Sequence, residues 1–401
     1  MSNEPLFNPM AAGFLQDPYP FYERLRTQDP WHLSPYGFFV VSRYADVNFV
    51  LRDPRFEKQS RGPKAGRLPP EVLNKAIFKS IAQFMLEKNP PDHGRIRSCF
   101  AEAFSRRRVE AMRVHIETVV DKIVDELRPR GRMDVMQDFA LHVPLTTITD
   151  ILGVPSEHRD LLFTISRFSG RISDPVPLDP REIDQVEADF LIAADCFREL
   201  IELRRRRPGE DLISHVVQAA GDQISIDELV ANLVLVFVAG HETTANILGN
   251  ALIALARHPD QLQLLRDNPT LIGGAVTECL RYDASVQIAS RTAKEKIVVG
   301  DATIAEGQDV LILLGSANRD GTVFENPDRL DIERRDTQLA SFGGGIHYCL
   351  GAQLSRVEIE YALGKLLADL PGFALEDASD VQWRNSIAFR GPEHLAASWR
   401  S

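Results

Sequence analysis

Cysteine is scarce in this chain of 401 residues, and its four copies stand far apart at positions 99, 196, 279 and 349. Thiols so few and so widely spaced exclude a disulfide scaffold and predict reduced cysteines in a reducing compartment. They are also too scattered to hold an iron–sulfur cluster. No Gly-x-Gly-x-x-Gly segment follows a predicted strand, so the sequence lacks a dinucleotide-binding unit as well.

The sequence also shows no excess of basic residues, no signal-peptide pattern and no long apolar run. The net charge of -11 argues against non-specific binding to nucleic acid. The first residues, Met1 to Pro9, contain neither the basic nor the apolar part of a signal peptide. No apolar run reaches the roughly 18 residues that span a bilayer. We therefore expect a soluble, cytoplasmic protein with no nucleic-acid or membrane partner, and we also expect it to be a monomer.

Helical patterning dominates the first two thirds of the chain. Apolar residues recur at positions i, i+3, i+4 and i+7 in segments 104–127, 134–152, 156–168 and 182–206. A capping box, Ser225 to Glu228, opens a helix that is apolar nearly all round and continues to His258, so we expect this helix at the centre of the fold. Short strands are predicted near the end, at 297–299, 302–304 and 310–314. The pattern predicts a mainly α protein with a minor β region.

Two segments between the predicted helices show no periodic pattern. Residues 57–70 are rich in Lys, Arg, Gly and Pro and are predicted to form a long loop. Residues 173–180 contain three prolines in eight positions, which is too rigid for a helix. We interpret this second segment as a mobile connection between two helices that lie over the core.

Several residues suited to ligand binding or catalysis occur together in one stretch, Ser341 to Gly351, with the sequence Ser-Phe-Gly-Gly-Gly-Ile-His-Tyr-Cys-Leu-Gly. Its three consecutive glycines let a flat ligand lie close to the main chain. Cys349 comes just before a helical pattern at 350–370, and peptide dipoles at a helix start stabilise a thiolate. A thiolate serves as a nucleophile or as a metal ligand, and the glycines favour the ligand. A zinc site with His347, or a buried free cysteine, would also explain a lone Cys349.

The predicted central helix carries polar residues in its segment Ala239-Gly-His-Glu-Thr-Thr244. Burial of Glu242 without a partner would cost several kcal/mol, so a compensating group is required. Gly240 costs about 1 kcal/mol relative to Ala inside a helix. The Thr243 hydroxyl can bond the carbonyl of Ala239 and bend the helix. We expect a groove at Ala239 and Gly240, although a packing kink with a solvated glutamate would give the same pattern.

A further motif, Glu278-x-x-Arg281, lies on a helix predicted to begin near Leu271. Residues three apart share one face of a helix. Such a pair is most often a surface ion pair that contributes a few tenths of a kcal/mol. Taken alone, the motif therefore indicates no function.

The order Phe-Gly-x-Gly-x-His-x-Cys-x-Gly, from Phe342 to Gly351, resembles the haem-binding loop of the cytochrome P450 monooxygenases. The acid and threonine at 242–243, the Glu-x-x-Arg at 278–281 and the segment 317–328 also match this family, in the expected order. The resemblance extends from about Asp17 to Arg390. It implies a cytochrome P450-like triangular helical fold around a buried haem, with one haem-thiolate monooxygenase domain over residues 1–401.

The resemblance also implies a cofactor and the residues around it. Haem b, iron protoporphyrin IX, would take the Cys349 thiolate as its axial ligand, and Glu242 with Thr243 would deliver protons. The residues matched to haem contacts and to the oxygen-binding groove are His93, Arg97, Ala239, Gly240, Arg291, Phe342 and His347. The residues matched to substrate-facing positions are Leu86, Leu235, Val238, Ala239, Val286, Gln287 and Ile387.

The implied reaction inserts one oxygen atom from O2 into an apolar small molecule, by hydroxylation or epoxidation. A ferredoxin with a separate ferredoxin reductase would supply electrons, because the chain has no flavin or iron–sulfur segment of its own. The positive patch expected to dock this acidic donor comprises Arg95, Arg106, Arg107, Arg108 and Arg113. A peroxide-driven oxygenase on the same scaffold is one alternative, and a haem-binding sensor or carrier without turnover is another.

Overall fold

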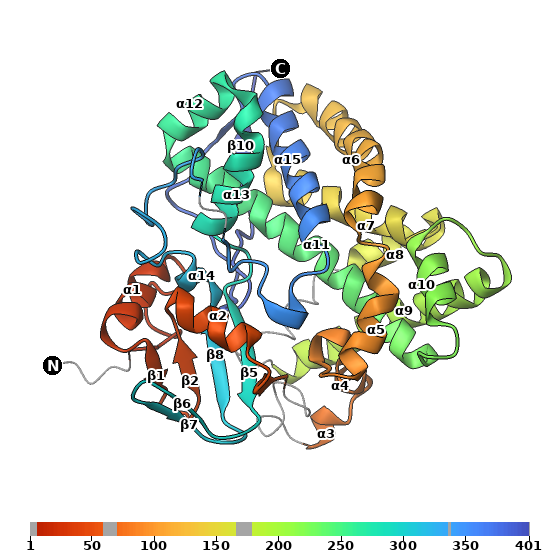
Figure 1. Cartoon of the computed structure of the whole chain (residues 1–401). Coiled ribbons are helices and arrows are strands. Elements are labelled where there is room, and N and C mark those ends of the chain that lie inside the picture. Colours follow the sequence, from red (N-terminus) through yellow and green to blue (C-terminus); the bar gives the residue numbers. More distant parts are fainter. Residues whose placement is uncertain (1–5, 59–69, 166–178, 336–337, 401) are drawn as a thin grey trace.

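The computed structural model describes residues 6–58, 70–165, 179–335 and 338–400. The predicted loop at 57–70 and the predicted proline-rich connection at 173–180 fall almost entirely outside these residues. The described part is mainly helical with small sheets, as the sequence predicts, and its outline is roughly triangular (Figure 1).

The α-helices are α1 (Tyr19–Gln28), α2 (Tyr44–Arg52), α3 (Pro70–Leu73), α4 (Ala76–Ile81), α5 (Asp92–Ala101), α6 (Arg106–Leu127), α7 (His142–Leu152), α8 (Ser156–Ile165), α9 (Pro180–Arg206), α10 (Leu212–Ala220), α11 (Ile226–Arg257), α12 (Pro259–Asp267), α13 (Ile272–Tyr282), α14 (Leu314–Ala317) and α15 (Ala352–Asp369). The strands are β1 (Trp31–Leu33), β2 (Phe39–Val41), β3 (Phe56–Glu57), β4 (Arg132–Asp134), β5 (Ile288–Ala293), β6 (Ile297–Val299), β7 (Ala302–Ile304), β8 (Asp309–Leu313), β9 (Ala374–Leu375) and β10 (Ala396–Ser398).

Helix α11 is the central element, as its sequence predicts. Its capping box forms in both directions, since the Ser225 hydroxyl accepts the N–H of Glu228 and the Glu228 carboxylate accepts the N–H of Ser225. The helix packs against α7, α9, α13 and α15. It is long and apolar enough to span a bilayer, but most of that surface is buried by these neighbours. We therefore interpret α11 as a core helix.

The strands form a small β region beside the helices. The main sheet has the order β1-β2-β8-β5-β3, in which β2 pairs with β8 in parallel and the other pairs are antiparallel. Smaller sheets have the orders β4-β10-β9 and β6-β7. The main sheet lies with α1, α2 and α14, whereas α13 and α15 pack on α11 and α6 packs on α15 (Figure 1). This arrangement brings β5 and the loop before α15 to the middle of α11.

One predicted helix differs from its structure at its start. The pattern at 134–152 predicts a single helix, but β4 ends at Asp134 and a π-helical stretch, Val135–Ala140, precedes α7. The Asp134 carboxylate accepts the N–H groups of Met136 and Gln137, which caps this stretch. Strand pairing with β10 therefore fixes a residue that periodicity assigns to the helix.

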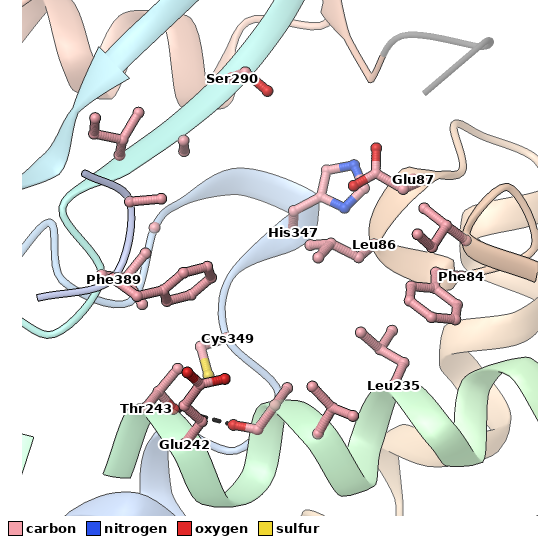
Figure 2. Close-up of a pocket in the computed structure, with 18 of the residues that line it drawn as sticks. Phe84, Leu86, Glu87, Leu235, Glu242, Thr243, Ser290, His347, Cys349 and Phe389 are labelled. Atoms are coloured by element: carbon pink, nitrogen blue, oxygen red, sulfur yellow. Dashed lines mark hydrogen bonds between the residues drawn. The ribbon is translucent and has the colours of Figure 1, made fainter. Parts of the chain in front are cut away.

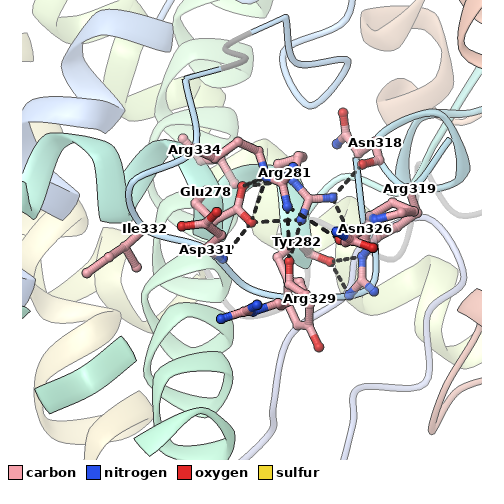
Figure 3. A network of polar contacts seen from close by, with 12 residues as sticks. Glu278, Arg281, Tyr282, Asn318, Arg319, Asn326, Arg329, Asp331, Ile332 and Arg334 are labelled. Carbon is pink, nitrogen blue, oxygen red and sulfur yellow. Dashed lines mark hydrogen bonds and ion pairs between the residues drawn. The ribbon is translucent and has the colours of Figure 1, made fainter. Parts of the chain in front are cut away.

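The Glu278–Arg281 pair is buried, unlike most pairs at this spacing. Two guanidinium nitrogens of Arg281 bond the two carboxylate oxygens of Glu278, each at 2.8 Å, and both side chains are almost fully shielded from solvent. Arg334 adds a second cation at 3.1 Å from Glu278 Oε2. Arg281 also donates to the main-chain carbonyls of Asn318, Pro327 and Arg329 (Figure 3). This network ties the irregular segment that leads to the cysteine loop onto α13.

Candidate active site

A large cavity of about 1310 Å³ lies where α11, β5 and the cysteine loop meet. Its wall is mostly apolar, and its volume exceeds the few hundred Å³ that a small ligand alone requires. Cys349 on its loop and Glu242 with Thr243 on α11 line this cavity (Figure 2). The structure therefore brings together the two motifs that the sequence places more than a hundred residues apart.

The cysteine loop uses glycine at two positions that other residues fit poorly. Gly343 and Gly345 have φ angles of +67° and +65°, in the left-handed region. A Cβ on Gly345 would also collide with the main-chain carbonyl of Leu51. The N–H of Cys349 donates to the carbonyl of Phe342 at 2.9 Å, which closes the loop on itself. The loop is thus held open toward the cavity by its own main chain.

Cys349 lies deep in the molecule and yet is accessible from the cavity. Burial raises the pKa of its thiol, while the N–H groups of Gly351 and Ala352 and the charge of Arg97 lower it. A bound metal cation would therefore add the stabilisation that the thiolate needs in this enclosed place. No cluster of three or more His, Cys, Asp or Glu side chains suited to a metal occurs among the described residues, so the zinc interpretation finds no support.

The middle of α11 faces the cavity where the sequence predicts a groove. Ala239 is exposed there, although most of the helix is buried. The Thr243 hydroxyl donates to the carbonyl of Ala239 at 3.0 Å, as predicted. A Cβ on Gly240 would come within 3.0 Å of Ile148, so glycine here also allows α7 to pack closely. Gly240 therefore combines the groove with the packing role that we considered as its alternative.

Arg384 is the compensating group that the burial of Glu242 requires. The guanidinium of Arg384 donates to the Glu242 carboxylate at 2.5 Å, and Glu242 is only 8% exposed. The partner comes from the C-terminal segment, 142 positions along the chain. No sequence pattern marks Arg384, because a contact over this distance leaves no periodic signal.

Cationic and imidazole groups crowd one side of the cavity. The predicted residues His93, Arg97, Arg291 and His347 all line it, as does Lys58, which the sequence analysis missed. The rings of His93 and His347 are 4.4 Å apart, and His93 Nε2 is buried with no hydrogen-bond partner among the described residues. Burial lowers the pKa of Arg291 to about 10, and burial with the nearby cations lowers that of His347.

Such a cluster needs anions from a ligand. The Glu87 carboxylate lies beside the cluster, with its Oε1 3.6 Å from Lys58 Nζ, and its charge raises the pKa of Lys58 and of Arg291 against the effect of burial. The two propionates of a haem would supply the missing negative charge, and the orphaned His93 nitrogen would gain an acceptor or donor. Arg97 also donates to the carbonyl of Tyr348 at 2.6 Å and so supports the cysteine loop. These side chains, with the thiol of Cys349, fit a haem.

Most of the predicted substrate-facing residues line the cavity, and one does not. Those that line it are Leu86, Leu235, Val238, Ala239, Val286 and Ile387. Gln287 must be corrected, because its side chain is 2% exposed and turns into the protein. Its amide donates to the carbonyl of Ala284 at 2.7 Å and to the Tyr19 hydroxyl at 3.3 Å. Successive residues of an extended segment point to opposite sides, so Val286 faces the cavity while Gln287 faces away.

Two members of the predicted arginine patch pair with acids of this chain. Arg95 is half-buried, and it bonds Glu228 at 2.6 Å and Asp92 at 2.9 Å. Arg113 pairs with Glu110 at 2.9 Å, so its charge is largely balanced. The remaining members, Arg106, Arg107 and Arg108, stand at the start of α6. We call these three residues the α6 arginines.

Comparisons with known proteins agree with this geometry. The family model described as Cytochrome P450 matches residues 30–382. Cytochrome P450 107B1 of Saccharopolyspora erythraea is 36% identical over 393 residues, covering 96% of this chain and 95% of the relative. The biotin biosynthesis cytochrome P450 of Bacillus subtilis is 34% identical and covers 97% of this chain and 98% of its own.

Solved structures are similar over the same extent. The crystal structure of CalO2 superposes with a TM-score of 0.92 at 34% identity and covers 98% of each chain. P450BioI, in complex with an acyl carrier protein ligated to hexadec-9Z-enoic acid, has a TM-score of 0.91 at 34% identity and covers 97% of this chain and all of that one. From the cysteine loop, the grooved central helix and these matches, the chain belongs to the cytochrome P450 family of monooxygenases.

Proposed function

We propose that this protein is a single-domain, cytoplasmic and monomeric haem-thiolate monooxygenase. It inserts one oxygen atom from O2 into an apolar small molecule, by hydroxylation or epoxidation, with electrons from a ferredoxin and its reductase. The observation that carries the proposal is that Cys349 and the pair Glu242-Thr243 line one mainly apolar cavity. A thiolate, a proton relay and an apolar wall are the parts that this reaction needs.

In this proposal the Cys349 thiolate would hold haem b through its iron, and the bound haem would supply oxygen activation, which a thiolate ligand favours. His93, Arg97, Arg291, His347 and Lys58, which line the cavity, would hold its propionates. Phe342 lies in the cysteine loop, and the guanidinium carbon of Arg356 lies over its ring, 5.2 Å from the ring centre. This contact supports the loop beside the thiolate.

Two residues of the chain relay protons from solvent into the cavity. Glu242 is held by Arg384 at the edge of the cavity, and Thr243 is the next residue. The Thr243 hydroxyl donates to the carbonyl of Ala239, so its oxygen keeps lone pairs for a proton or a water on the cavity side. Glu242 can thus take a proton from solvent, and Thr243 can orient its delivery.

Thr243→Ala is expected to bind ligands in the cavity as the wild type does but to lower the product formed per NADH consumed about tenfold or more, because proton delivery loses its last hydroxyl. Product, NADH and hydrogen peroxide are measured in the same reaction with a ferredoxin system. Thr243→Ser, which keeps the hydroxyl, serves as the matched control and should retain most of the coupling.

Three outcomes separate the proposal from its alternatives. Unchanged coupling in Thr243→Ala would reject the proposed relay. A wild type that forms product from added peroxide, but none from O2 and reduced ferredoxin, would be a peroxide-driven oxygenase. A wild type that binds haem tightly and yet accepts no electrons from any ferredoxin would be a sensor or carrier.

The α6 arginines are proposed as the docking site for the ferredoxin. Helix α6 packs against α15, the helix that follows the cysteine loop, and the proposal takes these side chains to face the thiolate side of the cavity. Arg106 and Arg107 are exposed. Exposed charges steer an acidic partner at low salt and are screened beyond roughly 8 Å at physiological ionic strength.

Reversal of charge in Arg106→Glu/Arg107→Glu is expected to slow reduction by ferredoxin at least about tenfold at low salt, through the association rate, and to leave ligand binding unchanged. Stopped-flow reduction at several salt concentrations measures this rate. The control is Arg206→Glu/Arg207→Glu, an exposed pair at the end of α9. Equal slowing in both double variants would assign the effect to net charge and reject the site.

A further inference from the structure

Asp189 stands where the pattern of α9 calls for an apolar residue. Val186, Phe190 and Ala193 form the face of α9 that lines the cavity, and Asp189 lies on the same face, one turn from Val186 and from Ala193. The residue is 8% exposed, although α9 has an exposed face where a carboxylate would be solvated. A buried acid in an otherwise apolar wall is costly, so a structural or functional partner is expected.

The described residues supply only part of that partner. Gln185 donates to Asp189 Oδ1 at 3.0 Å. Oδ2 is buried and has no hydrogen-bond partner among the described residues. Burial raises the pKa of the carboxyl and the bond from Gln185 lowers it, with no cation of the described chain contributing. The neighbouring acid Glu187 differs, because it bonds Lys75 and the N–H of Ala76.

We propose that Asp189 is a specificity residue that binds a hydrogen-bond donor, a hydroxyl or an amine, on an otherwise apolar substrate. This inference rests on the proposed function, because it takes the cavity to be the substrate site. Val186, Phe190 and Ala193 of α9, with Ile77, Phe78 and Ile81 of α4, give this part of the wall its apolar character. Lys79 of α4 also lines the cavity, but it is not among the groups that shift the pKa of Asp189. A substrate with one donor and a hydrocarbon body matches that wall, and its donor would bond Oδ2, which no described residue bonds.

The test compares pairs of probes that have or lack a hydrogen-bond donor. Decan-1-ol is compared with 1-methoxydecane, and decylamine, which is protonated at neutral pH, with decyltrimethylammonium, which keeps the charge but has no N–H, by calorimetric titration of the haem-loaded protein. The proposal expects at least one donor probe to bind the wild type about tenfold or more tightly than its capped partner, the effect of a hydrogen bond to a charged group. Asp189→Leu should reduce that ratio to about one while binding 1-methoxydecane at least as well.

Asp189→Asn separates the two donors. It should keep the preference for the alcohol if a neutral hydroxyl is recognised, and it should lose the preference for the amine if charge is recognised. Asp195→Asn, an exposed acid on α9, is the control and should leave every ratio unchanged. Donor probes that bind no better than their capped partners, or a ratio that survives in Asp189→Leu, would overturn the proposal.

Stability provides a second measurement that needs no ligand. An acid kept for binding destabilises the empty protein, so Asp189→Leu should melt at or above the temperature of the wild type. A clear fall in melting temperature would make Asp189 a structural residue and overturn the proposal. The red-shifted Soret band of the carbon monoxide complex depends on Cys349 and not on Asp189. Its presence in all variants therefore separates a failure of this inference from a failure of the proposed function.

Discussion

Cys349→His is expected to abolish the red-shifted Soret band that reduced protein shows with carbon monoxide, and to lower product formation below detection. Of the four cysteines, all of which the structure describes, Cys349 alone lines the cavity, and the N–H groups of Gly351 and Ala352 lie near its sulfur. Imidazole can ligate iron but lacks the electron density that a thiolate supplies. The variant should therefore still bind haem but show the spectrum of nitrogen ligation.

Absorption spectra of the reduced carbon monoxide complexes measure the first effect, and product formation with a ferredoxin system measures the second. Cys99→Ala is the matched control, since Cys99 is a buried free thiol on α5. It should keep both the band and the activity. Retention of the thiolate band in Cys349→His would mean that another group ligates the iron and would reject the proposed site.

Arg281→Ala is expected to cost about 3–5 kcal/mol of unfolding free energy, the range for breaking a buried ion pair. Its loss leaves the Glu278 carboxylate, which is 2% exposed, with Arg334 as its remaining cation. It also removes the donor for the carbonyls of Asn318 and Pro327, both at 2.8 Å. Because that segment leads to the cysteine loop, haem affinity should fall with stability.

Urea unfolding of the haem-free and haem-loaded proteins measures both effects. Arg281→Lys remains useful if the alanine variant does not fold, because a lysine keeps the charge but cannot form the two-pronged contact. Arg198→Ala is the matched control, as its pairs with Asp195 and Asp227 lie on the surface. It should cost less than about 1 kcal/mol. A similar small cost for both arginines would show that the buried network is dispensable.

The features that could be predicted from the sequence depend on residues close together in the chain. The capping box at Ser225 and Glu228 and the bond from Thr243 to Ala239 involve residues three or four apart, so spacing alone indicates them. The apolar periods of α6 and α9 predict their ends to within two residues. The cysteine loop could be recognised because glycine, histidine and cysteine are each required there at fixed positions.

The features that the sequence could not predict depend on distant contacts. The spacing of Glu278 and Arg281 is the same in a surface pair and in a buried one, and only the carbonyls around Arg281 decide between them. Gln287 was predicted to face the cavity because it matches a substrate-facing position of the family, but in the structure its side chain points away from the cavity and bonds Tyr19. The partner of Glu242 could not be named, because Arg384 approaches from another part of the chain.

The segment that holds Glu242 also touches whatever fills the cavity. Ile387 and Phe389 line the wall only a few residues after Arg384, and Arg390 then anchors the segment to Asp283 at 2.9 Å. A molecule that displaces Ile387 or Phe389 would therefore also displace Arg384, the partner of Glu242. The proposed role of Glu242 in proton delivery then implies that occupancy of the cavity and readiness to supply protons are coupled, so that a poorly fitting ligand would lower the coupling of electrons to product without any change at Thr243.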